Sequence, residues 1–109
     1  MSAVRITSNN DIARTTSIEH MQLVAYVSGR VHGVGFRYFV RTAAKRLGVT
    51  GWVRNERNGT LCVVAEGPTN RLHHLVRALR TGPSLSSVDG VQCEWQEPTG
   101  TFNEFSIRS

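Results

Sequence analysis

The chain has 109 residues, of which 39% are apolar and 19% charged, so it can build one small packed domain and is too short for two. Its longest apolar runs, such as residues 61–65, cover only a few positions, which excludes a membrane-spanning helix. Thirteen basic side chains against eight acidic ones give a formal charge of +5, and no acidic residue lies between Glu19 and Glu56. This charge favours anionic partners, whether nucleic acids, membrane surfaces or small phosphorylated molecules.

The N-terminal segment differs in composition from the rest of the chain. It is rich in Ser, Thr, Asn and Arg and shows neither helical nor strand periodicity. We expect residues 1–20 to form a flexible extension and residues 21–109 to form the folded domain. Cys62 and Cys93 are the only cysteines, and they do not form a CxxC pair. This usage predicts two reduced thiols in a cytoplasmic protein, although spacing alone leaves a disulfide between them open.

The first half of the domain predicts a strand, a helix and a β-hairpin. Residues 22–28 are a short β-rich run that ends at a glycine and is too short for a helix. Apolar side chains then recur with helical spacing over residues 36–47, and the glycine that follows is a typical helix stop. Two strand-like runs, 50–56 and 60–66, flank Asn58-Gly59, which supplies the backbone angles of a tight hairpin.

The second half predicts another helix and two strands. Thr69 is a candidate N-cap for a helix that ends before Gly82-Pro83. After a Ser-rich connection, residues 91–96 alternate between apolar and polar as in a half-buried strand, and residues 105–107 indicate a short last strand. This order of elements predicts an α+β, ferredoxin-like α/β sandwich (βαββαβ plus a short terminal strand), with two helices on one face of an antiparallel sheet.

A glycine-rich connection, residues 28–37, joins the first strand to the first helix. Its three glycines let backbone N–H groups turn inward beside the positive end of the helix dipole. Such a loop can bind a phosphate or carboxylate, although an ordinary flexible turn has the same composition. Arg37 favours the anion site, because the dipole disfavours a cation in the first turn of a helix unless an anion faces it.

Asn55 closes the second predicted strand, where a residue that disfavours strands needs a reason to be present. Asn is common beside hairpins, so simple turn chemistry is one interpretation. The other interpretation is functional, because a carboxamide both donates and accepts hydrogen bonds and can orient a water molecule for attack. The residue by itself does not decide between the two.

Four segments together resemble the signature of the acylphosphatase family, and the resemblance covers residues 22–109. They are Gly29–Arg37 (GRVHGVGFR), Leu47-Gly48, Gly51–Asn55 (GWVRN) and Asn58-Gly59. The resemblance implies a ferredoxin-like fold, a small-molecule acyl phosphate as substrate, inorganic phosphate as product, and no metal or organic cofactor. It also implies that Arg37 binds the phosphate and that Asn55 orients the attacking water. The chain departs from the family pattern at His32, where Gln is usual, and at Asn58, where Asp is common.

The resulting hypothesis is that Arg37 and several loop amides hold the phosphoryl oxygens while Asn55 holds water in line behind phosphorus. The loop amides are those of Arg30, Val31, His32, Gly33 and Val34. These motifs contain no acidic side chain, so we expect a phosphoryl oxygen of the substrate to take the proton of the water. His32 adds a group that titrates near neutrality, so its replacement by Gln should shift the pH profile.

Three alternatives compete with this interpretation. RNA-recognition domains share the same fold plan, but residues 60–66 contain no aromatic side chain on which bases stack, so nucleic-acid binding is not expected. Acylphosphatase-like domains also occur in the much longer maturation factor of nickel-iron hydrogenases, which leaves carbamoyl-phosphate handling or simple anion binding open. Adjacent His73 and His74 point about 100° apart on a helix and have no Cys or carboxylate at ligand spacing, so no metal site is expected. A monomer is the default expectation.

Overall fold

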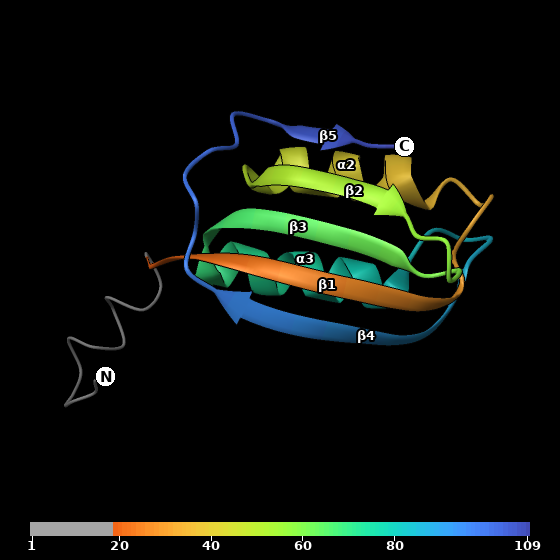
Figure 1. Cartoon of the computed structure of the whole chain (residues 1–109). Coiled ribbons are helices and arrows are strands. Elements are labelled where there is room, and N and C mark those ends of the chain that lie inside the picture. The colour runs from red at the N-terminus through yellow and green to blue at the C-terminus, as the bar shows by residue number, and fades with distance from the viewer. Residues whose placement is uncertain (1–18) are drawn as a thin grey trace, which may run out of the picture.

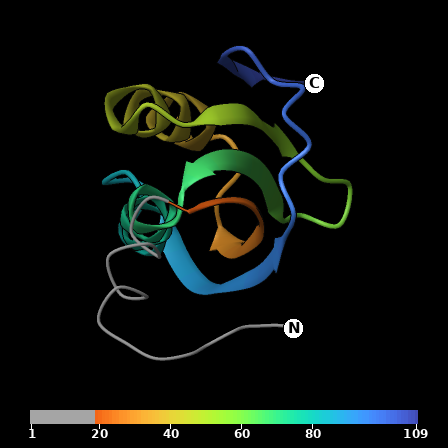
Figure 2. The same ribbon diagram turned by 90° about the vertical axis from the view of Figure 1, so that its left-hand side faces the viewer.

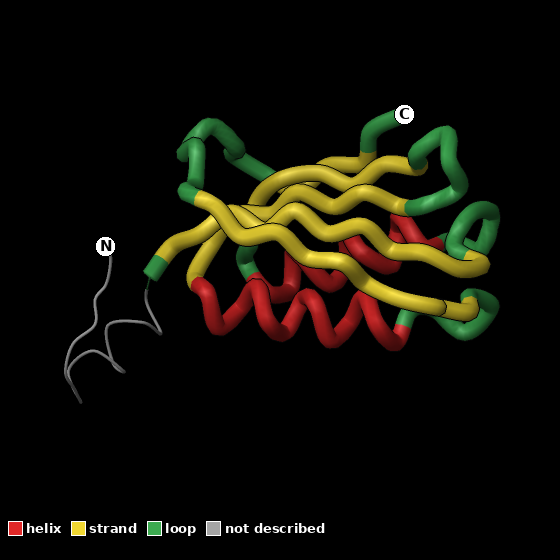
Figure 3. Tube along the Cα trace, turned by 60° about the horizontal axis from the view of Figure 1, so that its bottom comes forward, coloured by secondary structure: helices red, strands yellow, loops and turns green. Residues whose placement is uncertain are grey.

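The computed structural model describes residues 19–109, which form a five-stranded sheet with two helices on one face (Figure 1). The elements in chain order are β1 (His20–Arg30), α2 (Phe36–Leu47), β2 (Thr50–Asn55), β3 (Leu61–Pro68), α3 (Thr69–Thr81), β4 (Ser87–Gln96) and β5 (Phe105–Ile107). The strands lie in the order β4-β1-β3-β2-β5. Figure 3 shows both helices on the same side of the sheet, so the expected ferredoxin-like α+β sandwich is confirmed.

The core lies between the helices and the sheet face that they cover. Alternate residues of the three central strands are fully buried there, namely Leu23, Ala25, Val27, Val53, Leu61, Val63 and Ala65. The helices contribute Phe36, Val40, Ala43, Ala44, Leu72, Leu75, Val76 and Leu79. The buried residues of each helix recur at three- and four-residue spacing, so the apolar stripes evident in the sequence are the surfaces that pack on the sheet.

Two strands are longer than their sequence patterns indicate. β1 runs from His20 to Arg30, because its first residues pair with β3 and its last residues pair with β4. β4 begins at Ser87 and not at residue 91, because residues 87–90 pair with the end of β1 around a bulge. Backbone pairing therefore extends into a Ser-rich segment whose composition predicts a connection. Most of the predicted N-terminal extension, residues 1–18, lies outside the described residues.

The last strand corrects the expectation of a wholly antiparallel sheet. β5 pairs with β2 in parallel, with Gly51 opposite Phe105 and Val53 opposite Ile107. β4 runs antiparallel to β1, and β2 runs in the same direction as β1, so β4 ends where β2 starts. After β4, the chain crosses to the far edge of the sheet at the end where β2 starts. β5 therefore begins beside the start of β2 and runs in the same direction. Figure 2 shows this connection on the side of the sheet away from the helices.

Glu66 holds the connection between β4 and β5 against β3. Its carboxylate accepts hydrogen bonds from Thr99 N (2.8 Å), Thr99 Oγ1 (2.9 Å), Gly100 N (3.0 Å) and Gln22 Nε2 (2.6 Å). Burial alone would raise the pKa of Glu66, but these hydrogen bonds stabilise the charged form and hold the pKa below its ordinary value. Gln96 donates to Gln22 in turn, so the network joins β4, β1, β3 and the connection.

The start of α3 differs from the expected cap. Thr69 is the first helical residue, and Pro68 takes the N-cap position with no side-chain cap. Thr69 donates through N and Oγ1 to the carbonyl oxygen of Glu19, at 2.8 and 2.9 Å. The start of β1 pairs with Pro68, which brings the Glu19 carbonyl beside the helix, so strand pairing has replaced a local cap.

The two cysteines lie on opposite faces of the sheet. Cys62 pairs with Tyr26 and Cys93 pairs with Ala25, on the two strands that flank β1. Adjacent residues of a strand point to opposite faces, so this register excludes the disulfide that spacing alone left open. Both are free thiols, and burial raises the pKa of each.

Candidate active site

The connection between β1 and α2 adopts the left-handed turns that its glycines predict. Gly33 and Gly35 have φ angles of 70° and 78°, which L side chains rarely adopt. Gly35 is the N-cap of α2, and no side chain caps this helix. The first hydrogen bond of the helix runs from Phe39 N to Gly35 O. The backbone N–H groups that precede Phe39 therefore have no acceptor within the helix and lie at the positive end of its dipole.

A hollow of about 160 Å³ lies at this end of the helix, and we call it the α2 hollow. It is lined by Val31, Gly33, Gly35, Phe36, Arg37, Tyr38 and Asn55. Its size suits a phosphoryl group and a water molecule better than a larger ligand, since drug-sized ligands occupy about 300 Å³ or more. The fold therefore brings Arg37 and Asn55, which belong to different elements, to one small cavity.

Asn55 points into the α2 hollow because of its register in the sheet. It pairs with Leu61, so its side chain lies on the helix-covered face with Leu61 and with Val53, two residues earlier. Among the described residues, its Oδ1 is the one buried side-chain nitrogen or oxygen atom without a hydrogen-bond partner. An unpaired buried oxygen costs about 1–3 kcal/mol, so this atom is suited to accept a hydrogen bond from a molecule in the hollow.

Arg37 extends from the first turn of α2 and is half-buried. That turn contains no acidic residue, and no carboxylate of the described residues forms an ion pair with Arg37. A guanidinium that lines a small cavity beside a helix N-terminus makes the α2 hollow strongly positive. The next arginine along the helix is used differently, because Arg41 stacks on the ring of Tyr38 with 5.1 Å from Cζ to the ring centroid.

The predicted loop residues do not all line the cavity. Val31 and Gly33 line the α2 hollow, whereas Arg30, His32 and Val34 do not. Val31 is fully buried, so it anchors the loop in the core. Arg30 is an exposed residue that ends β1, and His32 is also exposed. The role of the five backbone amides in binding phosphate stays a prediction.

His32 ties the loop to the β2–β3 hairpin. Its Nε2 lies 2.8 Å from the carbonyl oxygen of Thr60, and the protonated nitrogen donates to that oxygen. Thr60 in turn donates to Asn58 Oδ1 through N (3.1 Å) and Oγ1 (2.7 Å). The two positions that depart from the family pattern thus meet at Thr60. Sequence reasoning missed this link, because nothing in the local pattern around Thr60 predicts its contact with a loop 28 residues earlier.

The described residues offer no metal cluster and no membrane-spanning helix. Within residues 19–109, no group of three or more His, Cys, Asp and Glu side chains is placed to hold a metal ion. His73 and His74 are exposed, and the His73 ring lies against Trp95 with 4.9 Å between the ring centroids. No helix between residues 19 and 109 is long and apolar enough to cross a membrane.

Comparison with known proteins gives a consistent result. The sequence profile of the acylphosphatase family matches residues 23–107. An acylphosphatase from Salinibacter ruber is 46% identical over 84 residues, which cover 77% of this chain and 88% of that protein. The crystal structure of acylphosphatase from Bacillus subtilis superposes with a TM-score of 0.79 and 37% identity, covering 82% of this chain and 99% of the other.

A longer protein shares the same fold. Full-length HypF, in a phosphate- and nucleotide-bound form, matches with a TM-score of 0.75 and 26% identity, covering 84% of this chain and 12% of that one. The two acylphosphatases, by contrast, are covered over 88% and 99% of their own length. This chain belongs to the acylphosphatase family, whose members are hydrolases that act on acyl phosphates.

Proposed function

We propose that the chain hydrolyses the carboxyl–phosphate anhydride bond of acyl phosphates, with Arg37 and the loop amides binding phosphate and Asn55 orienting the attacking water. The observation that carries this proposal is the convergence of Arg37, the uncapped end of α2 and the unpaired Oδ1 of Asn55 on one hollow of about 160 Å³. A phosphoryl group can accept hydrogen bonds from the Arg37 guanidinium and from the N–H groups at the start of α2, and a water molecule can donate to Asn55 Oδ1.

The chemistry explains why so few groups are needed. The bond between phosphorus and the acyl oxygen breaks, and the leaving group is a carboxylate whose conjugate acid has a pKa of about 4. Such a group leaves without a general acid, so the enzyme has to position the reactants and neutralise the charge of the phosphoryl oxygens. Arg37 and the N–H groups at the start of α2 supply that charge stabilisation.

The attacking water binds to the carboxamide of Asn55. Its O–H donates to Asn55 Oδ1, which directs the lone pair of the water toward phosphorus. Asn55 is not a base, and no acidic side chain lines the α2 hollow. The nearest acidic residue in sequence, Glu56, is held by Arg54 at 2.7 Å. The proton of the water therefore passes to a phosphoryl oxygen, and the products are a carboxylate and inorganic phosphate.

The test is hydrolysis of acetyl phosphate by the purified chain in the presence of EDTA. We expect turnover that survives the chelator, and a loss of about 100-fold or more in kcat/KM in Arg37→Ala and Asn55→Ala. Arg41→Ala is the matched control, because Arg41 lies one helical turn further on and does not line the α2 hollow. Near-normal turnover in Arg37→Ala would overturn the assignment.

Carbamoyl phosphate is a second candidate substrate. The resemblance of the sequence to acylphosphatase-like domains of the hydrogenase maturation factor leaves this substrate open. Carbamoyl phosphate has the same mixed anhydride bond and a compact acyl group, so the α2 hollow has no evident means to exclude it. A kcat/KM for carbamoyl phosphate above that for acetyl phosphate would favour this substrate.

A further inference from the structure

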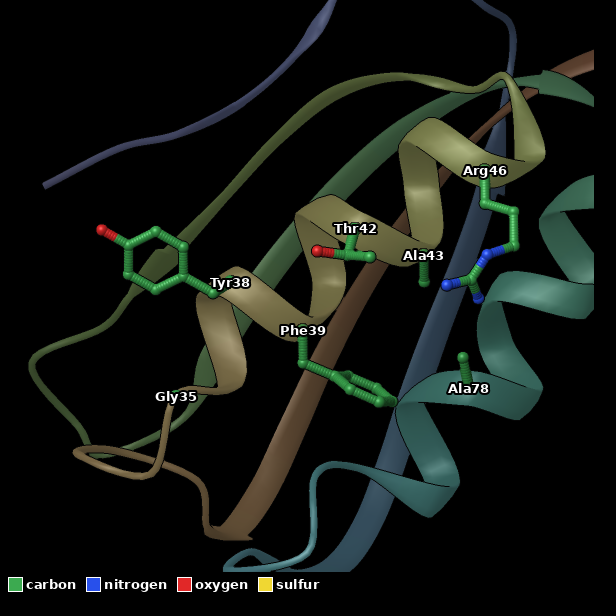
Figure 4. Close-up of a pocket in the computed structure, with 7 residues that line it drawn as sticks. All are labelled: Gly35, Tyr38, Phe39, Thr42, Ala43, Arg46 and Ala78. Carbon is green, nitrogen blue, oxygen red and sulfur yellow. The ribbon is translucent and has the colours of Figure 1, made fainter.

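An apolar groove of about 330 Å³ runs between α2 and α3 (Figure 4). It is lined by Gly35, Tyr38, Phe39, Thr42, Ala43, Arg46 and Ala78. Phe39 points from α2 toward α3, and Arg46 extends toward α3 at the far end of the groove (Figure 4). The proposed hydrolysis of a phosphate anhydride uses none of the side chains deep in this groove.

The groove adjoins the α2 hollow. Gly35 and Tyr38 line both cavities, so one end of the groove opens at the N-terminus of α2 where the phosphate is proposed to bind. A second neighbouring hollow, of about 450 Å³, shares Asn55 with the α2 hollow and is lined mainly by polar side chains of the β2–β3 hairpin. The phosphate position thus has a polar opening on the side of Asn55 and an apolar opening on the side of Gly35.

The geometry of the displacement indicates which opening faces the attacking water and which faces the leaving group. In a displacement at phosphorus, the attacking water and the leaving oxygen lie on opposite sides. Asn55 holds the water in the proposed mechanism, and Asn55 does not line the groove. The leaving carboxylate and the acyl group attached to it therefore lie on the side of Gly35 and Tyr38. We propose that the groove between α2 and α3 binds the acyl group, and that the preferred substrates are acyl phosphates with an extended apolar acyl chain.

The lining chemistry defines the substrate class further. Phe39, Ala43 and Ala78 present carbon atoms to the groove, and burial of each methylene group against them favours binding. Arg46 closes the far end with a positive charge that no carboxylate of the described residues neutralises. A cationic acyl group, such as that of an aminoacyl phosphate, is therefore disfavoured. This inference rests on the proposed hydrolysis of acyl phosphates and adds its selectivity.

The experiment compares acetyl phosphate with hexanoyl phosphate. The two leaving carboxylates have nearly the same basicity, so their intrinsic reactivity is matched and a difference reports binding of the chain. We expect kcat/KM for hexanoyl phosphate to exceed that for acetyl phosphate by about tenfold or more, chiefly through a lower KM. Thr42→Phe places a ring in the groove from an exposed position and should bring the ratio of the two kcat/KM values close to one.

Lys45→Phe is the matched control, because it adds the same ring to an exposed position of α2 that does not line the groove. It should keep the wild-type ratio. Equal kcat/KM for both substrates in the wild-type chain would overturn the groove assignment and leave the proposed hydrolysis intact. If Thr42→Phe leaves the ratio of the two kcat/KM values unchanged, the groove does not bind the acyl group. A sedimentation coefficient of Thr42→Phe that differs from that of the wild-type chain would then make the groove a contact between two copies of the chain. Turnover of neither substrate by the folded chain would remove both proposals.

Discussion

The side-chain oxygen of Asn55 is buried and receives no hydrogen bond from the described residues. The sequence left two roles for this residue, a turn former and a water-orienting group. A turn former would satisfy its oxygen with nearby backbone N–H groups. The oxygen instead faces a cavity that also contains Arg37, which supports the functional interpretation.

Because this oxygen is unpaired, we expect Asn55 to lower the free energy of unfolding of the folded chain. Asn55→Ala removes a buried polar atom without leaving a partner unsatisfied, so we expect the free energy of unfolding to stay equal or to rise by up to about 1 kcal/mol. The measurement is urea unfolding of both proteins, beside the loss of activity. A drop in stability of more than about 1 kcal/mol would show that the carboxamide has a structural role that its geometry does not reveal.

His32 is the residue whose role changed most once its contacts were known. Its ring lies outside the α2 hollow and contacts Thr60 O, so we expect it to position the loop. His32→Ala should lower kcat/KM about fivefold, the equivalent of one net hydrogen bond, and His32→Gln should restore most of it because a carboxamide also donates.

The measurement is kcat/KM for the wild-type chain, His32→Ala and His32→Gln under the same conditions. Equal kcat/KM in all three proteins would show that the contact between His32 and Thr60 does not position the loop.

At the scale of secondary-structure elements, the connection from β4 to β5 depends on one carboxylate. Glu66 accepts four hydrogen bonds, three of them from Thr99 and Gly100 in the connection, so it holds the segment that brings β5 to the far edge of the sheet. Glu66→Gln replaces an acceptor oxygen with a donor, so N–H groups that now bind the carboxylate, among them that of the buried Gln22, lose their acceptor. We expect a loss of about 2 kcal/mol in the free energy of unfolding at pH 7.

The stabilisation by Glu66 should depend on pH. The pKa of Glu66 in the folded chain lies below its ordinary value of 4.5, so the folded state favours the charged form. The contribution is therefore complete above pH 4.5 and is lost as pH falls through the lower folded pKa. Urea unfolding of wild type and Glu66→Gln at pH 7 and pH 3 tests this, and an equal gap at both pH values would contradict it.

At the scale of the whole molecule, the positive charge is concentrated in the segment that contributes both residues of the candidate site. The formal charge is +5, and the segment from His20 to Asn55 contains arginines and a lysine but no acidic residue. A field of this kind attracts small anions to the N-terminal end of α2. Acyl phosphates carry negative charge at neutral pH, so the field should assist their binding.

The strength of this attraction should fall with salt. We expect KM for acetyl phosphate to rise severalfold between about 0.01 M and 0.15 M ionic strength, over which the Debye length shrinks from about 30 to 8 Å, while kcat stays nearly constant. The double variant Arg41→Gln, Lys45→Gln should show a flatter dependence, because it removes two exposed or half-exposed charges near the site and leaves Arg37 in place. Equal salt dependence in both proteins would show that these charges do not steer the substrate.

The sequence by itself determined the order of the elements and the apolar faces of both helices, and it predicted the two residues of the candidate site. These features are local. Helical spacing of apolar residues, a glycine-rich loop before Arg37 and a hairpin after Asn55 each depend on neighbours within a few positions, where propensity and side-chain direction act. The family motif added the separation between Arg37 and Asn55, and the hollow that they share agrees with it.

Only the tertiary structure decided the features that depend on distant segments. Strand pairing lengthened β4 and replaced the expected cap at Thr69, and the course of the chain after β4 made β5 parallel to β2. The contact of His32 with Thr60 and the groove between α2 and α3 join residues far apart in the chain. A short-range pattern does not record which segments meet, because that choice is made by backbone pairing and packing across the whole sheet.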